Sequence, residues 1–239
     1  MKTIILAGGR GTRLAEETGT LPKPMVQIGG KPMIWHLMNS YASQGFSDFV
    51  IATGYLSEVI DSYVRDLDET WNVETLFTGV DTQTGGRIKQ CIEGYPDDEF
   101  LATYGDGLAN VDVHDLVRFH RANSFMATMT AVRPPARFGV VQIDSGVVTH
   151  FGEKLQSDSD WINGGFFVLK RTITDFILSD LEPFETGAIP RLAAKGMLGG
   201  FQHSGFWKPM DTLREKQEFE ILASLQEPPW IRESTSKRH

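Results

Sequence analysis

A glycine-rich turn followed by cations stands near the start of the chain. It follows the apolar run at residues 4–6 and contains Gly8, Gly9 and Gly11. Glycines leave the backbone bare and tolerate positive φ, so main-chain N–H groups can approach a phosphate or the edge of a base. A hydroxyl and two cations follow, which are groups that a polyphosphate needs: Thr12, Arg13 and Lys23. The stretch therefore indicates a site for a nucleoside polyphosphate.

This turn differs from two common phosphate-binding motifs. Residues 7–13 read AGGRGTR and lack the G-x-G-x-x-G spacing of a dinucleotide-binding fold. No Gly-Lys-Ser/Thr follows at the spacing of a P-loop. An ordinary Gly-rich corner between a strand and a helix is the alternative. The position of Lys23 favours the binding loop, because Pro22 and Pro24 restrict its backbone and direct its side chain.

Two aspartates are candidates for holding a divalent cation. Asp106 lies between Gly105 and Gly107 after an apolar stretch, and Asp211 follows the sequence KPM. Mg²⁺ prefers one or two protein carboxylates together with phosphate oxygens. Each aspartate also has a purely structural interpretation, as a turn residue at Asp106 and as a helix cap at Asp211. Spacing alone leaves both interpretations open.

The expected elements alternate between strands and helices over the first hundred residues. Strands are predicted at 4–6, 48–53, 72–78 and 100–104, and helices at 33–41, 56–67 and 87–93. This order predicts right-handed βαβ units and a Rossmann-like, doubly wound α/β fold with a mostly parallel sheet. After a helix at 114–122, short turns separate further strands at 126–132, 139–143, 147–151 and 165–169, which indicates a mixed sheet. Further helices are predicted at 172–181, 189–195 and 212–225.

Ligands of an open α/β sheet gather outside the carboxyl ends of its strands. Three candidate motifs follow such ends: the glycine turn, Asp106, and the pair Glu153 and Lys154. We therefore expect the three to converge on one site. The domain is predicted to cover 1–225, with a nucleotide half at about 1–110, a sugar half at about 111–225, and a loose tail at 226–239.

Composition limits the function classes. The chain has 239 residues and a net charge of −8, which argues against a bulk nucleic-acid binder. Cys91 is the only cysteine, so no internal disulfide is possible. No apolar run approaches the 18 residues of a membrane span, and no signal peptide is evident. We expect a cytoplasmic protein without a membrane partner.

The motif LAGGRGTRL at 6–14, followed by KPM at 23–25, resembles the sugar-1-phosphate nucleotidyltransferases. Four later stretches extend the resemblance over about 1–225: TGGR at 84–87, YGDG at 104–107, NGGFF at 163–167 and GFWKPMDTLR at 205–214. They narrow it to members that join CTP to glucose 1-phosphate with Mg²⁺. The resemblance also implies a homo-oligomer, a trimer or a hexamer, and a setting in lipopolysaccharide O-antigen synthesis.

The resemblance implies a role for individual residues. Catalytic roles fall to Arg13, Lys23 and Asp106, and metal ligation to Asp106 and Asp211. Nucleotide binding falls to Leu6, Ala7, Gly8, Gly9, Gly11, Thr12, Arg13, Lys23, Thr82, Arg87 and Gly105. Binding of the sugar phosphate falls to Glu153, Lys154, Asn163 and Gly164.

Two departures from the family leave the substrates open. Leu155 stands where most relatives have proline after the lysine, and the chain is shorter between Val64 and Asp81. A uridylyl-, thymidylyl- or guanylyltransferase for another sugar phosphate is therefore an alternative. A non-catalytic regulatory subunit of the same fold is another, although the presence of Lys23, Asp106 and Asp211 argues against it.

Overall fold

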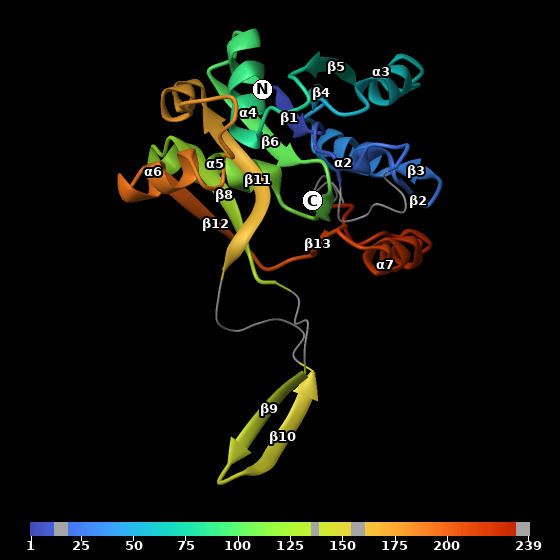
Figure 1. The fold of residues 1–239 in the computed structure, drawn as a ribbon, viewed down its shortest axis with the longest axis vertical. Helices are drawn as coiled ribbons and strands as arrows, with labels where there is room; N and C mark the ends of the chain where they lie inside the picture. Colours follow the sequence, from blue (N-terminus) through green and yellow to red (C-terminus); the bar gives the residue numbers. More distant parts are fainter. Residues whose placement is uncertain (12–18, 135–138, 154–160, 233–239) are drawn as a thin grey trace, which may run out of the picture.

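The computed structural model describes residues 1–11, 19–134, 139–153 and 161–232, with the backbone alone at 139–143 and 150–153 (Figure 1). A seven-stranded sheet forms its centre. In spatial order the strands are β12 (Leu198–His203), β8 (Ala127–Val132), β11 (Ile162–Lys170), β6 (Glu99–Tyr104), β1 (Thr3–Leu6), β4 (Asp48–Thr53) and β5 (Asn72–Phe77). Only β11 runs antiparallel to its neighbours, β6 and β8. The prediction of a mixed, mostly parallel α/β sheet is confirmed, and strands from both halves of the chain share it.

Helices cover both faces of this sheet. Their bounds are α2 (Met33–Ala42), α3 (Ser57–Arg65), α4 (Thr84–Gly94), α5 (Val113–Asn123), α6 (Ala188–Ala194) and α7 (Leu213–Ala223), with single 3₁₀ segments η2 (Lys23–Met25) and η3 (Arg171–Phe176). Ile5 packs in a cluster with apolar residues of α2, α3, α5 and α7, whereas Ile4 packs with those of α4 and α6. Because successive strand residues point to opposite faces, a strand buried on both sides is apolar throughout, as residues 4–6 are. No helix in the described part of the chain is long and apolar enough to span a bilayer.

Helix α4 begins at Thr84, three residues before the start that we predicted. Gly85 and Gly86, which precede the predicted helix at 87–93, lie in the first turn of α4. A Cβ at Gly85 would lie 2.6 Å from the carbonyl oxygen of Glu182, and one at Gly86 would lie 2.5 Å from the Cα of Asp180. The two glycines therefore allow the 180–184 segment to pack against the start of the helix.

The 180–184 segment begins within the region that we predicted as helix. The prediction of helix over 172–181 is wrong beyond Phe176, where η3 ends. The backbone carbonyls of Asp180 and Glu182 instead accept hydrogen bonds from the N–H groups of Gln83 and Gly85. These N–H groups lie at the start of α4, where helix geometry leaves them without intrahelical partners.

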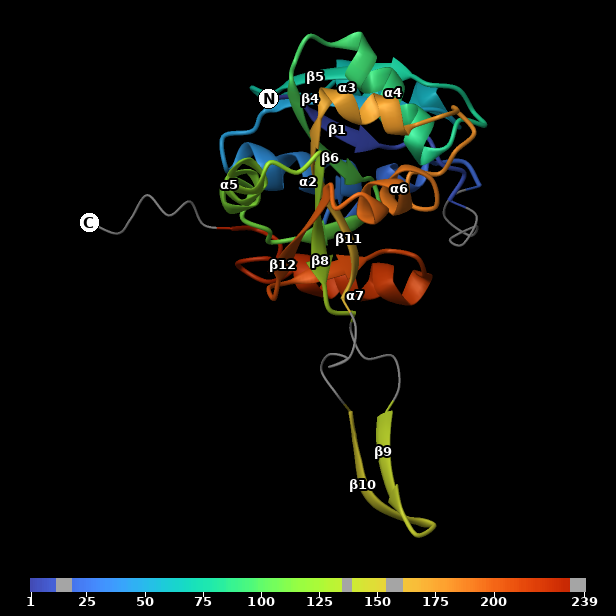
Figure 2. The same ribbon diagram turned by 90° about the vertical axis from the view of Figure 1, so that its left-hand side faces the viewer.

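Strands β9 (Gly139–Asp144) and β10 (Val147–Glu153) lie outside the central sheet. They pair only with each other, so our expectation that they join the mixed sheet is wrong. Ser145 and Gly146 both have positive φ, which suits the two-residue turn of a hairpin. Figures 1 and 2 show this hairpin away from the body of the molecule, and Val147 and Val148 on it are exposed. The two strands therefore satisfy their backbone hydrogen bonds by pairing with each other.

The C-terminal segment is not loose as far as Arg232. Trp230 is 1% exposed and packs against Phe219 and His36, with ring centroids 5.6 and 5.4 Å away. Arg232 forms an ion pair of 2.8 Å with Asp112. The N–H of Ile231 donates to the carbonyl oxygen of Pro228. The prediction of a loose tail is therefore wrong for 228–232, and residues 233–239 lie outside the described part of the chain.

Replacing Trp230 by alanine is expected to destabilise the protein by about 3–5 kcal/mol, because it empties a buried site in the core. Urea unfolding measures the change. Ile231→Ala is the matched control, since Ile231 is 40% exposed, and its effect should stay within about 1 kcal/mol. Equal effects of the two variants would contradict the docking of this segment.

His120 is expected to make stability depend on pH. Its side chain is fully buried with Nδ1 2.8 Å from Thr128 Oγ1, and burial lowers its pKa, with Lys170 and Arg121 adding to the effect against Glu99. An unfolded histidine takes up a proton near pH 6.5, whereas His120 in the folded chain stays neutral to lower pH. The contribution of neutral His120 to the free energy of unfolding is therefore complete above pH 6.5 and is lost as the pH falls below 6.5.

The free energy of unfolding is expected to fall by at most about 1.4 kcal/mol per pH unit, the limit for the uptake of one proton. Urea unfolding of wild type and His120→Leu at pH 7, 6 and 5 measures it, and the variant should have a smaller slope. His114→Asn, at an exposed histidine, is the control and should keep the wild-type slope. An unchanged slope in His120→Leu would contradict the prediction.

Candidate active site

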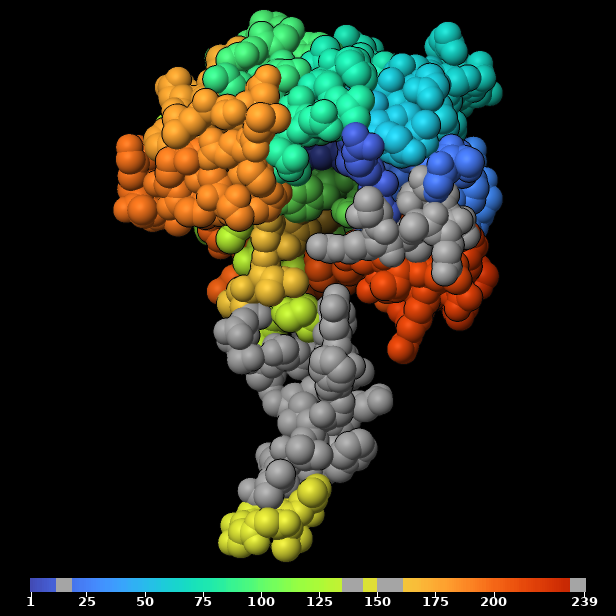
Figure 3. Space-filling view, in the orientation of Figure 1, coloured from blue at the N-terminus to red at the C-terminus, as the bar shows by residue number. Residues whose placement is uncertain are grey.

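A cavity of about 470 Å³ lies at the carboxyl ends of β1 and β6. The surface is hollowed where blue residues of the N-terminal turn meet green residues of β6 (Figure 3). Its size is in the range of sites for small molecules. The lining residues are Leu6, Ala7, Gly8, Gly9, Arg10, Gly11, Lys23, Pro24, Val80, Asp81, Thr82, Gln83, Thr84, Arg87, Tyr104, Gly105, Asp106 and Asp211.

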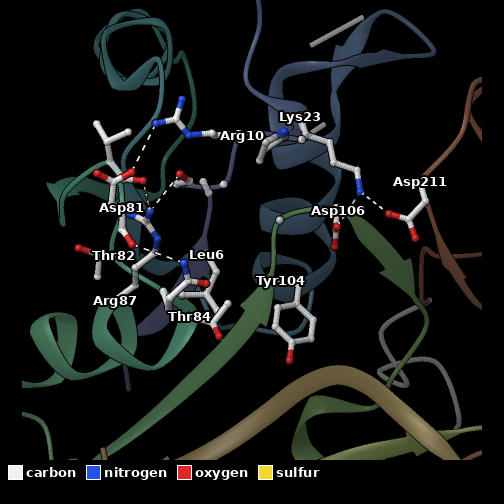
Figure 4. A pocket seen from close by; sticks show the side chains of 18 residues that line it. Leu6, Arg10, Lys23, Asp81, Thr82, Thr84, Arg87, Tyr104, Asp106 and Asp211 are labelled. Carbon is white, nitrogen blue, oxygen red and sulfur yellow. Dashed lines mark hydrogen bonds and ion pairs between the residues drawn. The ribbon is translucent and has the colours of Figure 1, made fainter. Parts of the chain in front are cut away.

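One end of the cavity contains a lysine between two carboxylates (Figure 4). The Nζ of Lys23 lies 2.7 Å from Asp106 Oδ2 and 2.7 Å from Asp211 Oδ1. Lys23 is 8% exposed and lies in η2, between two prolines. Burial by itself lowers the pKa of Lys23, but the charges and hydrogen bonds of Asp106 and Asp211 outweigh it, and the pKa is raised. The side chain therefore remains an ammonium ion at neutral pH.

Two short strands bring the aspartates together although 104 residues separate them in the chain. Strand β7 (Gly107–Ala109) follows Asp106 and pairs antiparallel with β13 (Trp207–Pro209), which precedes Asp211. The N–H of Met210 donates to the carbonyl oxygen of Asp106 at 2.8 Å. Helix α7 then begins with a capping box at Thr212 and Glu215, and the Glu215 carboxylate also accepts a hydrogen bond from the N–H of Asp211. The backbone on both sides of each aspartate is thus held in place.

The two carboxylates fit a divalent cation. Asp106 Oδ2 and Asp211 Oδ1 both lie 2.7 Å from Lys23 Nζ, so the two oxygens are no more than twice that distance apart. The positively charged group that now lies between them is the ammonium of Lys23. Among the described residues no cluster of three or more acidic, histidine or cysteine side chains could hold a metal by itself. Two carboxylates completed by phosphate oxygens are the donor set that Mg²⁺ commonly takes.

Comparisons with known proteins agree with this geometry. The family model described as Nucleotidyl transferase matches residues 2–209. The chain belongs to the nucleotidyl transferase family. It is 45% identical to the glucose-1-phosphate cytidylyltransferase of Salmonella typhi, over 96% of this chain and 98% of that protein. It is 37% identical to a probable glucose-1-phosphate cytidylyltransferase of Bacillus subtilis, over 96% and 99%.

More distant nucleotidyl transferases differ in the names of their substrates. A mannose-1-phosphate guanyltransferase of Yarrowia lipolytica is 35% identical over 87% of this chain and 60% of its own length. The solved structure of HddC from Yersinia pseudotuberculosis, complexed with GMP-PN, has a TM-score of 0.71 at 25% identity, over 92% of this chain and 98% of that one. The resemblance that the motifs indicated is confirmed, and so is the fold.

Arg87 of this nucleotidyl transferase holds the loops at the other end of the cavity. It is 4% exposed, and its guanidinium donates to the carbonyl oxygens of Gly8 and Thr53 at 3.0 and 2.9 Å and to Thr78 Oγ1 at 2.6 Å. A Cβ at Gly8 would lie 2.1 Å from its Nη1, so the first glycine of the turn permits this contact. Burial lowers the pKa of Arg87. The contacts observed are with the binding loops themselves, and a contact with the nucleotide stays a prediction.

Most of the predicted site residues meet in the cavity. Those that line it are Leu6, Ala7, Gly8, Gly9, Gly11, Lys23, Thr82, Arg87, Gly105, Asp106 and Asp211. Thr12, Arg13 and Lys154 lie outside the described residues. Asn163 and Gly164 lie in β11, and Asn163 reaches the lining residue Tyr104 through a hydrogen bond of 3.0 Å to its hydroxyl.

The expected convergence of three strand ends needs correction. Glu153 ends β10, which belongs to the separate hairpin, so the third motif does not follow a strand of the central sheet. The physical reason is that β10 finds its hydrogen-bonding partner in β9. The role of Glu153 toward a sugar stays a prediction.

Sequence reasoning missed several lining residues. Tyr104 lines the cavity from the end of β6, and Thr84 lines it from the start of α4, three residues before the predicted helix. Arg10 and Asp81 form an ion pair of 3.4 Å at the end of the cavity where Arg87 lies (Figure 4). The Gly-Arg-Gly spacing at 9–11 was the available signal for Arg10, whereas nothing in the sequence indicated its pairing with Asp81.

Proposed function

We propose that this nucleotidyl transferase is a glucose-1-phosphate cytidylyltransferase, which converts CTP and α-D-glucose 1-phosphate into CDP-glucose and pyrophosphate. The observation that carries the proposal is the pair of carboxylates around Lys23 beside a glycine turn. The choice of substrates rests on the 45% identity to the Salmonella typhi protein over nearly the whole of both chains.

The chemistry needs positioning more than proton transfer. An oxygen of the sugar phosphate is already an anionic nucleophile, so it needs no general base. It attacks the α-phosphorus of CTP in line, the new P–O bond forms, and the bond to the bridging oxygen breaks with its electron pair leaving on pyrophosphate. Bringing two anions together and stabilising the transition-state charge are then the tasks of the site.

The charged side chains divide these tasks. Lys23 neutralises the α-phosphate, and the N–H groups of the glycine turn hold the triphosphate. Arg13 acts on the departing pyrophosphate, Lys154 on the incoming phosphate, and Glu153 with Asn163 on the sugar; these roles rest on the family resemblance.

Asp106 and Asp211 would hold Mg²⁺, which supplies Lewis-acid stabilisation of phosphate oxygens and a template for the two substrates. Lys23, whose Nζ lies between the two carboxylates, lines the same cavity as the glycine turn.

A pyrophosphate-release assay tests the substrates. CTP, UTP, dTTP, ATP and GTP are each combined with glucose 1-phosphate, and CTP and GTP are each combined with mannose 1-phosphate. We expect CTP with glucose 1-phosphate to have a kcat/KM at least about tenfold above any other pair, which is a difference of about 1.4 kcal/mol. A preference for GTP and mannose 1-phosphate would assign the chain to the guanyltransferases, and no release with any pair would indicate a non-catalytic protein. The proposed homo-oligomer is measured separately by light scattering.

A further inference from the structure

A carboxylate behind the cavity joins two of its walls. Glu185 lies between η3 and α6, and it does not itself line the cavity. Its Oε2 accepts a hydrogen bond of 2.7 Å from Thr84 Oγ1, and its Oε1 accepts one of 2.5 Å from the hydroxyl of Tyr104. Thr84 begins α4 and Tyr104 ends β6, and both line the cavity (Figure 4). One side chain therefore connects a helix start on the nucleotide side with a strand end beside Asp106.

The hydrogen bonds continue from Tyr104 to β11. The hydroxyl of Tyr104 accepts a hydrogen bond of 3.0 Å from Asn163 Nδ2, and Asn163 Oδ1 accepts one of 2.9 Å from the N–H of Gly165. The next carbonyl oxygen, of Gly164, accepts a bond of 2.7 Å from Trp207 Nε1. Because Trp207 lies in β13, which leads to Asp211, this chain of contacts passes from the nucleotide side around to the cation end of the cavity.

A carboxylate at this position sets the direction of the hydrogen bonds that the Tyr104 hydroxyl makes to Glu185 and Asn163. An ionised carboxylate can only accept, so the Tyr104 hydroxyl must donate to Glu185. Its oxygen is then available only as an acceptor toward Asn163, so the amide nitrogen of Asn163 must face it. The orientation of the Asn163 amide is thereby defined.

We propose that Glu185 is a positioning residue for the sugar phosphate, acting through Tyr104 on the Asn163 amide. The proposal rests on the proposed function, in which Asn163 meets the sugar. An asparagine amide has two N–H groups and two carbonyl lone pairs. One of each is engaged by Tyr104 and by Gly165, and these two contacts fix the directions of the other two, the first of them supported by Glu185 through the Tyr104 hydroxyl. A hexose hydroxyl, which both donates and accepts, is the partner that such a fixed amide recognises.

The test replaces Glu185 by glutamine, which has the same shape but carries an N–H₂ group. That group can donate to the Tyr104 hydroxyl, which would then donate toward Asn163 Nδ2, itself a donor, and this hydrogen bond would be lost. Glu185→Gln is expected to raise the KM for glucose 1-phosphate about tenfold, the loss of roughly one oriented hydrogen bond, and to change the KM for CTP less than twofold. Tyr104→Phe should likewise raise the KM for glucose 1-phosphate and change the KM for CTP little. The double variant should have a KM for glucose 1-phosphate no higher than that of either single variant, because both changes break the same hydrogen bonds between Glu185 and Asn163.

A matched control comes from the same loop. Glu182 pairs with Arg191 and accepts from the N–H of Leu178, away from the cavity. Glu182→Gln loosens the loop without touching Tyr104, so it should leave both KM values unchanged even if it lowers the melting temperature. Equal rises of both KM values in Glu185→Gln, or additive effects in the double variant, would overturn the proposal. If Glu185→Gln fails to fold, Tyr104→Phe decides alone.

Failure of the proposed function has a different signature. If the wild type prefers another sugar phosphate or nucleotide, the substrate assay shows it before any variant is made. The same comparison of KM values is then carried out with the preferred pair, so the role of Glu185 is decided independently.

Discussion

Replacing Asp106 by asparagine is expected to lower kcat by at least about 10²–10³-fold, the effect of removing one electrostatic group from a transition state. Asp106 Oδ2 lies 2.7 Å from Lys23 Nζ and shares that cation with Asp211. Asparagine keeps the shape but removes the negative charge that a divalent cation needs. Because the side chain is 39% exposed, the fold should remain intact, with a melting temperature close to that of the wild type. Pyrophosphate release and thermal unfolding measure the two quantities.

A carboxylate outside the cavity serves as the control for this variant. Glu58 lies exposed on α3, so Glu58→Gln should keep wild-type turnover. Near-normal, Mg²⁺-dependent activity of Asp106→Asn would show that the metal assignment is wrong. A loss of activity that accompanies unfolding would instead show that Asp106 is needed for the fold.

Replacing Lys23 by methionine is expected to have two effects of opposite direction. Turnover with CTP should fall by about 10²–10³-fold, because the α-phosphate loses its positive partner. Binding of a divalent cation without nucleotide should become tighter, by about tenfold or more, because an ammonium ion no longer lies between the two carboxylates. Methionine matches the length of the buried stem and its apolar packing, so the change is mainly one of charge.

Titration with Mn²⁺, followed by electron paramagnetic resonance, measures the second effect without any turnover. Lys31→Met, at an exposed lysine outside the cavity, is the control and should leave both Mn²⁺ affinity and turnover unchanged. Weaker Mn²⁺ binding in Lys23→Met would mean that Lys23 organises the two aspartates more than it competes with a cation. Unchanged turnover would remove Lys23 from the catalytic set.

Much of the nucleotide side could be predicted from local sequence. The strand at 48–53 was predicted with the bounds of β4, because the run DFVIAT is apolar and β-branched and is buried on both faces. The glycine turn was located because its residue types are unusual at that spacing. Errors arose where distant segments compete with local preference. Examples are 177–181, where the carbonyl oxygen of Asp180 accepts a hydrogen bond from Gln83 at the start of α4, and Trp230, whose burial depends on α2 and α7.

The site shows the same difference between what local sequence predicts and what distant segments decide. The sequence by itself determined which chemical groups are present: a glycine turn, a lysine between prolines, two aspartates in distinctive motifs, and the order of strands and helices that puts the turn at a sheet edge. Only the tertiary structure decided that Lys23 lies between Asp106 and Asp211, because that contact depends on β7 and β13, two three-residue strands from distant parts of the chain. Strands so short carry almost no periodic signal. The same holds for Glu185, whose importance comes from the hydroxyls that the fold places around it.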